Sequence, residues 1–401
     1  MKSFILGILL SSSFAILAND WPRWRGPDLN GISKETGWTT SWPAEGPKQS
    51  WKAQVGIGFS SVTVANGRVF TIGNSNETDT VFCFEESSGK ELWKHSYPCQ
   101  LDAKYYEGGP GSSPTCEKDR LYTLSKRGHL FCFDAANGNV IWQKNLIDEL
   151  GVKKNEWGFA GSPLVEGNLL VLNVGEAGTA VDKGTGKVVW TSGKEMAGYA
   201  TPVPFNSGSE RMAAIFSSQA LIGLAMKSGK EHWRFPWVER WHINAADPVI
   251  SGNRIFISSF DKGCALLEMR GGSTPSVVWE NKNMGNHFSG CVLVNGYLYG
   301  INGNTDKPEK DFRCLFLQTG ELKWSYPGLG LGAVTVADNK LIIMSERGEL
   351  VIAEVSPDAF KPIARAQVLG GKCWTVPVFA NGRIYCRNAQ GTLVCLDVSK
   401  S

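Results

Sequence analysis

The stretch Cys83-Phe-Glu-Glu-Ser-Ser-Gly-Lys-Glu-Leu-Trp93 decides the fold, because variants of it recur along the chain. In each copy a small residue is followed ten positions later by tryptophan, and a turn glycine stands four residues before that tryptophan. Apolar alternation on both sides of the glycine predicts two antiparallel strands joined by a tight turn. The pairs are Cys83 with Trp93, Cys132 with Trp142, Ala180 with Trp190, Gly223 with Trp233 and Cys314 with Trp324, and Cys264 with Trp279 is interpreted as the same unit carrying five inserted residues.

A second pair of short strands precedes each hairpin. Residues 61–70 indicate strand, turn and strand around Gly67, and the corresponding glycines recur about every 45 residues as far as Gly382. Four strands in about 45 residues is the size of a propeller blade. The copies begin near Ser60, Gly111, Gly161, Tyr199, Asn244, Phe288, Gly332 and Trp374. The sequence therefore predicts an all-β fold, an eight-bladed β-propeller of four-stranded antiparallel blades over residues 49–400.

The two ends of the repeat region predict how the ring closes. The eighth copy stops at residues 397–401, before any tryptophan strand, while a spare strand at residues 49–55 carries Trp51 ahead of the first copy. We expect this N-terminal strand to complete the last blade, which removes an exposed sheet edge. The seventh copy, residues 351–368, has no tryptophan, so we expect that blade to be the least regular.

The N-terminus has the pattern of a targeting segment. Lys2 is followed by an apolar run over residues 4–17 that ends at Ala18, which predicts a signal peptide over residues 1–18. The run is too short to span a bilayer comfortably, and no cysteine near the cleavage point offers a lipid anchor. We expect a periplasmic or secreted monomer, with an N-terminal extension over residues 19–48 ahead of the propeller.

The charge balance bears on the partners. A formal net charge of +3 over 401 residues gives no reason to expect binding to nucleic acid or to an acidic membrane. The expected partner is therefore a protein or a small-molecule ligand, whose identity stays open.

The repeat resembles the pyrroloquinoline-quinone (PQQ)-type propeller repeat over residues 49–400, and Trp21-Pro-Arg-Trp-Arg-Gly-Pro27 is similar to the N-termini of secreted bacterial PQQ-like propellers. Two groups share this repeat: quinoprotein dehydrogenases and non-enzymatic scaffolds such as BamB. The resemblance thus implies the fold and leaves the function open between an enzyme and a binding module.

Several features argue against the enzyme. Quinoprotein alcohol dehydrogenases typically carry two adjacent bridged cysteines, acidic and Asn calcium ligands and a catalytic Asp, and this chain has no adjacent cysteines. Asp247 could serve as a base but fits equally well as a turn residue. No Gly-x-Ser-x-Gly, phosphate-loop or HExxH motif and no metal-binding spacing is present. We therefore expect a non-catalytic binding or scaffold module without cofactor or metal. The alternative is a PQQ-dependent oxidoreductase with a divergent site, and a third option is a carbohydrate-binding or carbohydrate-processing propeller.

Two residue sets receive structural interpretations. Tryptophans that recur once per blade are expected to dock one sheet against the next: Trp51, Trp93, Trp142, Trp190, Trp233, Trp279 and Trp324. Five cysteines at one repeat position need only be small and buried. Cys99 and Cys116 lie in or beside the connection between blades 1 and 2, where export would permit a disulfide.

The candidate site follows from the repeat alignment. Phe59, Phe159, Phe288 and Trp374 each stand eight residues before the turn glycine of their copy, just ahead of the strand expected to line the channel. These aromatic residues either plug the channel as core or form the floor or mouth of a binding site. The full candidate set is Phe59, Phe159, Tyr199, His242, Asn244, His287, Phe288 and Trp374, with Lys372 and Glu156 as polar neighbours and the loops of Tyr105-Tyr106-Glu107 and Glu156-Trp157 expected over the same rim.

Overall fold

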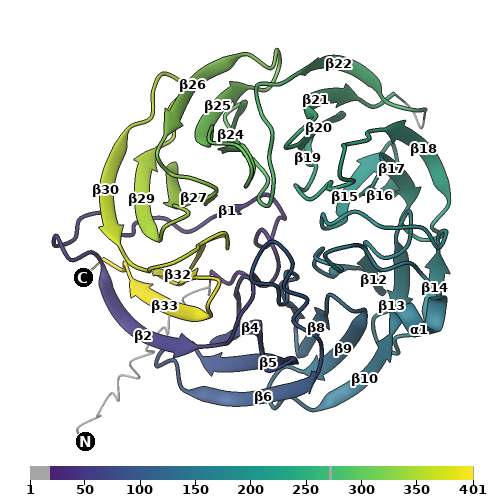
Figure 1. The fold of residues 1–401 in the computed structure, drawn as a ribbon, viewed down its shortest axis with the longest axis horizontal. Coiled ribbons are helices and arrows are strands. Elements are labelled where there is room, and N and C mark those ends of the chain that lie inside the picture. The colour runs from purple at the N-terminus through teal and green to yellow at the C-terminus, as the bar shows by residue number, and fades with distance from the viewer. Residues whose placement is uncertain (1–18, 271–272, 401) are drawn as a thin grey trace, which may run out of the picture.

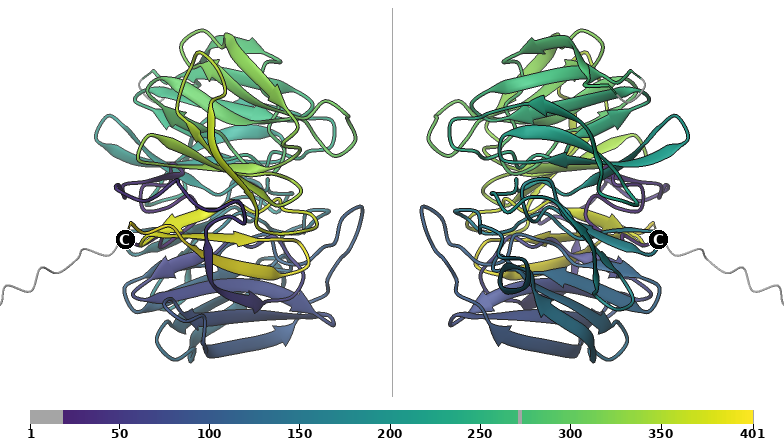
Figure 2. Two further views of the ribbon diagram at one scale, coloured as in Figure 1. Left: turned by 90° about the vertical axis from the view of Figure 1, so that its left-hand side faces the viewer. Right: turned by 90° about the vertical axis from the view of Figure 1, so that its right-hand side faces the viewer.

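The four-strand repeat is present eight times in the computed structural model, which describes residues 19–270 and 273–400. The eight sheets stand around a central channel (Figure 1), and the side views show a thick disc (Figure 2). This confirms the predicted propeller. The signal peptide expected over residues 1–18 lies outside the described residues.

In each of the first four blades the first strand lies at the channel and the last at the outer wall. Their strands are β3 (Thr63–Ala65), β4 (Arg68–Ser75), β5 (Thr78–Glu85) and β6 (Glu91–Pro98) in blade 1, β7 (Thr115–Glu117), β8 (Arg120–Leu124), β9 (His129–Asp134) and β10 (Val140–Asn145) in blade 2, β11 (Leu164–Glu166), β12 (Leu169–Leu172), β13 (Thr179–Asp182) and β14 (Val188–Thr191) in blade 3, and β15 (Val203–Ser207), β16 (Glu210–Phe216), β17 (Ala220–Ala225) and β18 (Glu231–Pro236) in blade 4.

The remaining blades follow the same order from the channel outward. Their strands are β19 (Val249–Ser251), β20 (Arg254–Ser259), β21 (Gly263–Glu268) and β22 (Ser276–Asn281) in blade 5, β23 (Val292–Val294), β24 (Tyr297–Asn302), β25 (Asp311–Phe316) and β26 (Leu322–Pro327) in blade 6, β27 (Ala333–Ala337), β28 (Lys340–Met344), β29 (Glu349–Glu354) and β30 (Pro362–Gln367) in blade 7, and β31 (Val378–Ala380), β32 (Arg383–Arg387), β33 (Thr392–Asp397) and β2 (Lys48–Gln54) in blade 8. Strand β1 (Ile32–Ser33) joins blade 7 beside β27.

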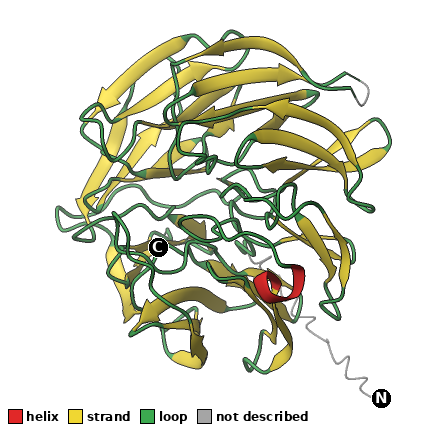
Figure 3. Cartoon of the chain, turned by 45° about the vertical axis from the view of Figure 1, so that its right-hand side comes forward, coloured by secondary structure: helices red, strands yellow, loops and turns green. Residues whose placement is uncertain are grey.

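Helix α1 (Leu146–Leu150) follows blade 2 on the outside of the ring (Figure 3). The Asn145 side chain caps its N-terminus by accepting a hydrogen bond from the Ile147 amide at 2.9 Å, and Gly151 ends it in the left-handed conformation at φ 63°. Within the part of the chain that the structure describes, no helix has the length and apolar character needed to cross a membrane.

The ring closes as the sequence predicts. Strand β2 pairs antiparallel with β33, which places Trp51 opposite Cys395 and makes the N-terminal strand the outer strand of blade 8. Trp51 then reaches blade 1, where its indole N–H donates to the Glu86 carbonyl at 2.9 Å. Its ring lies so close to Gly89 that a Cβ there would stand 2.5 Å from it, which leaves room only for glycine in that turn.

The same indole contact recurs around most of the ring. Trp93, Trp142, Trp190, Trp279 and Trp324 each donate the indole N–H to a backbone carbonyl of the next blade at 2.9–3.1 Å. Among the described residues Trp233 has no such hydrogen bond. Instead it packs beside Gly223 of its own blade and in an apolar cluster shared by blades 4 and 5.

Two details of the repeat differ from expectation. In blade 5, Trp279 lies opposite Leu266 rather than Cys264, because the inserted turn is shorter than the five residues assumed for it. Blade 7 is a regular sheet, although Ala364 lies where the other blades have tryptophan. Trp38 and Trp42, from the N-terminal extension, belong to the same apolar cluster as Ala364 and supply the missing indole bulk.

The N-terminal extension also crosses the channel (Figure 1). Trp21 exchanges two backbone hydrogen bonds of 2.9 Å with Val64 of β3, and the Pro22 carbonyl accepts from the Cys116 amide of β7 at 2.7 Å. Arg25 donates to the Cys291 carbonyl ahead of β23 at 2.7 Å, and β1 pairs parallel with β27. Residues 21–33, called the plug below, therefore fill the channel between the inner strands of blades 1, 2, 6 and 7.

Candidate functional site

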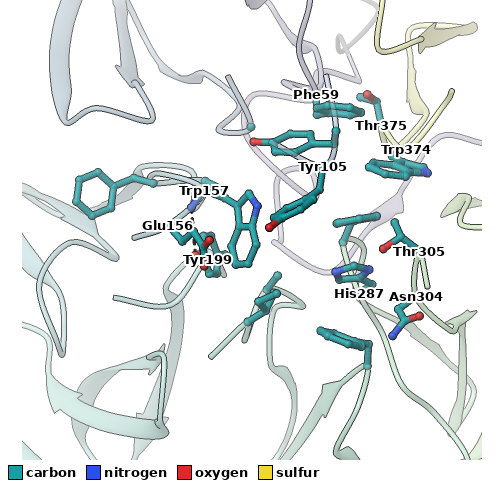
Figure 4. Close-up of a pocket in the computed structure, with 18 of the residues that line it drawn as sticks. Phe59, Tyr105, Glu156, Trp157, Tyr199, His287, Asn304, Thr305, Trp374 and Thr375 are labelled. Atoms are coloured by element: carbon teal, nitrogen blue, oxygen red, sulfur yellow. Dashed lines mark hydrogen bonds between the residues drawn. The ribbon is translucent and has the colours of Figure 1, made fainter. Parts of the chain in front are cut away.

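A cavity of about 780 Å³ lies on the channel axis above the plug (Figure 4). Its wall is built from the residues just before the inner strands, and Trp24 of the plug and Asp247 contribute to the lining. Because the plug occupies the channel below, the cavity is a cup rather than a pore. We call it the cup.

Six of the eight predicted site residues line the cup. They are Phe59, Phe159, Tyr199, His287, Phe288 and Trp374. The structure thus brings together side chains from blades that are far apart in sequence, because equivalent positions of a closed repeat converge on its axis. That these residues bind a ligand stays a prediction.

One wall of the cup is a continuous stack of rings. Phe59 stacks on Trp374 with 5.4 Å between ring centroids, and Trp374 stacks on Phe288 at 4.2 Å. Phe288 stacks on His287 at 3.8 Å, and His287 contacts Phe260 at 4.5 Å. Each ring restricts the next, so the wall is held in one arrangement before any ligand arrives.

The facing wall comes from three loops, which precede blades 2, 3 and 4. Trp157 and Tyr199 lie 6.1 Å apart between ring centroids, and Tyr105 stands beside Trp157 in Figure 4. Tyr105 is 87% exposed, which places it at the mouth of the cup. Both predicted overhanging loops therefore line the cup.

Asn244 and His242 are not part of the lining. The Asn244 side chain is fully buried, where it donates to the Ser217 and Trp237 carbonyls at 2.8 and 3.1 Å and accepts from the Ser259 hydroxyl at 2.6 Å. It joins blades 4 and 5, so its assignment to the rim is wrong. At His242 the chain turns with φ 60°, and the neighbouring Trp241 and Ile243 line the cup instead.

Two carboxylates of the cup, those of Glu156 and Asp247, already have protein partners. Glu156 forms an ion pair with Lys104. Asp247 accepts from the Trp24 indole N–H at 2.5 Å and from the Thr201 amide at 2.7 Å, and lies 4.0 Å from the Arg25 guanidinium. Burial raises the pKa of Asp247, although Arg25 opposes this shift. Asp247 thus anchors the plug to blade 5, a role that the sequence did not indicate.

Two buried polar atoms of lining residues have no hydrogen-bond partner among the described residues. They are the Thr375 hydroxyl oxygen and Nδ1 of His287, and each has almost no accessible surface, so neither faces the open cavity. Burial, with a smaller contribution from Lys310, lowers the pKa of His287 to about 3, so its imidazole is neutral near pH 7.

The described lining contains no Lys or Arg. Lys372, predicted as a polar neighbour, is not among the lining residues; its ammonium lies 4.3 Å from the centroid of the Trp374 ring and pairs with Glu107 at 2.8 Å. The lining is therefore aromatic, neutral and acidic, with no cation facing the cavity.

The sequence did not identify every residue of the cup. Trp24, Trp241, Phe260 and the segment 304–306 also line it. Two of these residues could have been predicted from the sequence, because Trp24 lies in the N-terminal motif that supported the family resemblance and Trp241 directly precedes His242. The others lie in loops that differ from blade to blade, so an alignment of the repeats does not identify them.

The cysteines are separate thiols. All ten are free and buried, and the predicted bridge between Cys99 and Cys116 is not formed. Although both belong to one apolar cluster, Cys99 lies by Asp79 whereas the Cys116 thiol faces the Lys118 carbonyl at 3.8 Å. Within residues 19–270 and 273–400, no three His, Cys, Asp or Glu side chains lie together as a set that could hold a metal ion.

Solved structures with the same fold come from different functional classes. BamB from Moraxella catarrhalis is 14% identical, with a TM-score of 0.64 over 88% of this chain and 99% of its own. Quinohemoprotein alcohol dehydrogenase from Comamonas testosteroni is 13% identical, with a TM-score of 0.69 over 96% of this chain and 81% of its own. The computationally designed Ika8 protein is 9% identical, with a TM-score of 0.59. At these identities the likeness concerns the fold alone.

Sequence comparison is more specific. No curated protein matches the chain. A family model does match, over residues 77–326, and its description is outer membrane protein assembly factor BamB. That match covers more than half of the chain, including blades 2 to 5 in full and nearly all of blade 6. The chain therefore belongs to the family of the outer membrane protein assembly factor BamB.

Proposed function

We propose that this protein is an exported, non-catalytic propeller that binds its ligand or partner in the cup. The observation that carries this proposal is the plug: it blocks the channel directly beneath a preorganised ring of aromatic side chains. A concave, mostly apolar site with a few placed polar groups is the usual form of a binding pocket. A volume of about 780 Å³ is in the range of pockets that enclose small organic ligands.

The cup does not fit PQQ, the cofactor that the repeat family suggests. PQQ carries three carboxylates, which need cationic partners when they leave water. No Lys or Arg is present in the described lining, whereas the carboxylates of Glu156, Asp247 and Asp306 are. Glu156 and Asp247 already have Lys104 and Arg25 within ion-pair distance, so neither pair offers a free cation to the PQQ carboxylates. The described lining therefore lacks the cationic side chains that would hold the PQQ carboxylates, and we assign no quinone chemistry to this chain.

A PQQ-binding assay tests the non-catalytic part of the proposal. The purified protein is incubated with PQQ and CaCl₂, and its absorbance and dye-linked oxidation of alcohols and aldose sugars are recorded. We expect no protein-bound chromophore and no turnover. Stoichiometric PQQ binding with substrate-dependent dye reduction would establish the quinoprotein oxidoreductase instead.

A thermal-shift screen tests whether the cup is the binding site. A ligand present at 100 times its Kd stabilises the native state by about 2.7 kcal/mol. We expect the shift to disappear in Trp374→Ala and Phe288→Ala, whose rings form the stacked wall. Phe360→Ala is the matched control, because that ring packs against Tyr326 and Trp324 at the outer wall. A ligand that still shifts both cup variants would bind elsewhere.

Export is the last part of the proposal. It is supported by the N-terminal sequence pattern and by membership of the BamB family. Expression with the complete N-terminus should give a processed, monomeric protein outside the cytoplasm that begins near Asn19. N-terminal sequencing of cell fractions and light scattering check both points, and an unprocessed cytoplasmic protein would refute export.

A further inference from the structure

The polar side chains that line the cup are neutral or acidic. They include the hydroxyls of Tyr105 and Thr305, the Asn304 amide and the carboxylates of Glu156 and Asp306. Hydroxyls and amides can donate or accept hydrogen bonds, whereas ionised carboxylates only accept them. The complementary ligand groups are therefore neutral donors and acceptors, of which hydroxyls are the simplest.

The charges of the cup argue against an ionic ligand. An anion would meet no Lys or Arg in the described lining. A cation would gain little from Glu156 and Asp247, because Lys104 and Arg25 already lie within ion-pair distance of them. Asp306 is exposed at the mouth, where water and salt screen its charge. A neutral ligand incurs none of these penalties, and the carboxylates still accept hydrogen bonds from hydroxyl groups.

The aromatic walls require a ligand with apolar surface as well as hydroxyls. Trp374 and Phe288 form one wall and Trp157 the other, so a ligand between them is in contact with rings on both sides. Aromatic faces carry partial negative charge and attract the slightly positive C–H groups of a bound molecule. A sugar ring has C–H-rich faces and hydroxyls around its edge, which matches this arrangement.

We infer that the cup binds a short neutral oligosaccharide. This inference rests on the proposed function, since it names the ligand class of the same site. The volume of about 780 Å³ accommodates more than one sugar ring, and two exposed aromatic residues, Tyr105 and Trp241, extend the contact surface to the mouth. Further sugar units could project between them into solvent.

Isothermal titration calorimetry tests the inference with defined probes. The neutral probes are maltotriose, cellotriose and tri-N-acetylchitotriose, and the charged probes are trigalacturonate and choline. We expect one or more neutral trisaccharides to bind and both charged probes to fail. Trp374→Ala should weaken that binding at least about tenfold, whereas Phe360→Ala should not.

The outcomes distinguish this inference from the proposed function. Binding of choline or trigalacturonate that is lost in Trp374→Ala would overturn the saccharide class and leave the cup as a binding site. Failure of all three neutral trisaccharides to bind would also overturn the saccharide class, while the thermal-shift screen decides the cup independently. Trisaccharide binding unaffected by Trp374→Ala would place the sugar elsewhere.

Discussion

Replacing Trp51 by alanine should weaken the closure between blades 8 and 1. Trp51 is 6% exposed, and its ring lies 5.9 and 6.1 Å from Tyr385 and Phe84, centroid to centroid. Truncating a buried tryptophan costs about 3–5 kcal/mol, because apolar contact is lost and a cavity remains. The Glu86 carbonyl also loses its indole donor. We therefore expect a loss of about 3–5 kcal/mol within a total of about 5–15 kcal/mol.

Urea unfolding followed by tryptophan fluorescence measures this loss. Trp93→Ala is the matched control. Trp93 is also buried, and its indole N–H donates to the Ala135 carbonyl of the next blade at 3.1 Å, but its blade is built from one continuous stretch of chain. Both variants should lose similar stability. Only Trp51→Ala should release β2 and expose β33 as a free edge, which promotes aggregation. A Trp51→Ala protein that stays monomeric and loses less than about 1 kcal/mol would refute this account of closure.

Three further predictions concern buried polar groups. Arg387 is buried and forms no ion pair with a carboxylate of the described residues. It donates to the Ser60, Ile72 and Gly56 carbonyls at 2.7–3.1 Å, so Arg387→Met should lower the free energy of unfolding in urea by about 2–4 kcal/mol. No loss would mean that water replaces these bonds. The pKa of His287 is about 3 when folded and 6.5 in the reference state, so the unfolded chain binds the extra proton and stability should rise with pH between these values. His287→Phe, which keeps the ring stack, should reduce the rise of the free energy of unfolding with pH in this window. An unchanged pH dependence would exclude His287 as the cause of the rise. Alkylation of the denatured, unreduced protein should add ten alkyl groups per chain, counted by mass spectrometry, because all ten thiols are free. In the native protein Cys99 and Cys116 should react slowly, because burial raises the pKa of each thiol to about 12. Addition of only eight groups to the denatured protein would show that the two cysteines form a disulfide.

The repeat fixed much of the candidate site in advance. Phe59, Phe288 and Trp374 were placed by counting back from turn glycines, and they meet in one ring stack. Counting failed at Asn244, which occupies the aligned position but uses its amide to join blades 4 and 5. It failed again at Trp279, because the length of an irregular turn cannot be read from spacing alone. Equivalent positions share a location, but each side chain takes its role from its neighbours.

The sequence by itself determined the four-stranded unit, the number of blades and the strand that closes the ring, because strand alternation and turn glycines are local signals that each copy repeats. The tertiary structure alone decided that residues 21–33 block the channel and that Asp247 holds them there. These features depend on contacts between segments as far apart as Trp24 and Asp247. Each such contact occurs only once and does not recur along the sequence. The sequence pattern therefore does not reveal which residues will meet, and only the closed ring brings the two segments together.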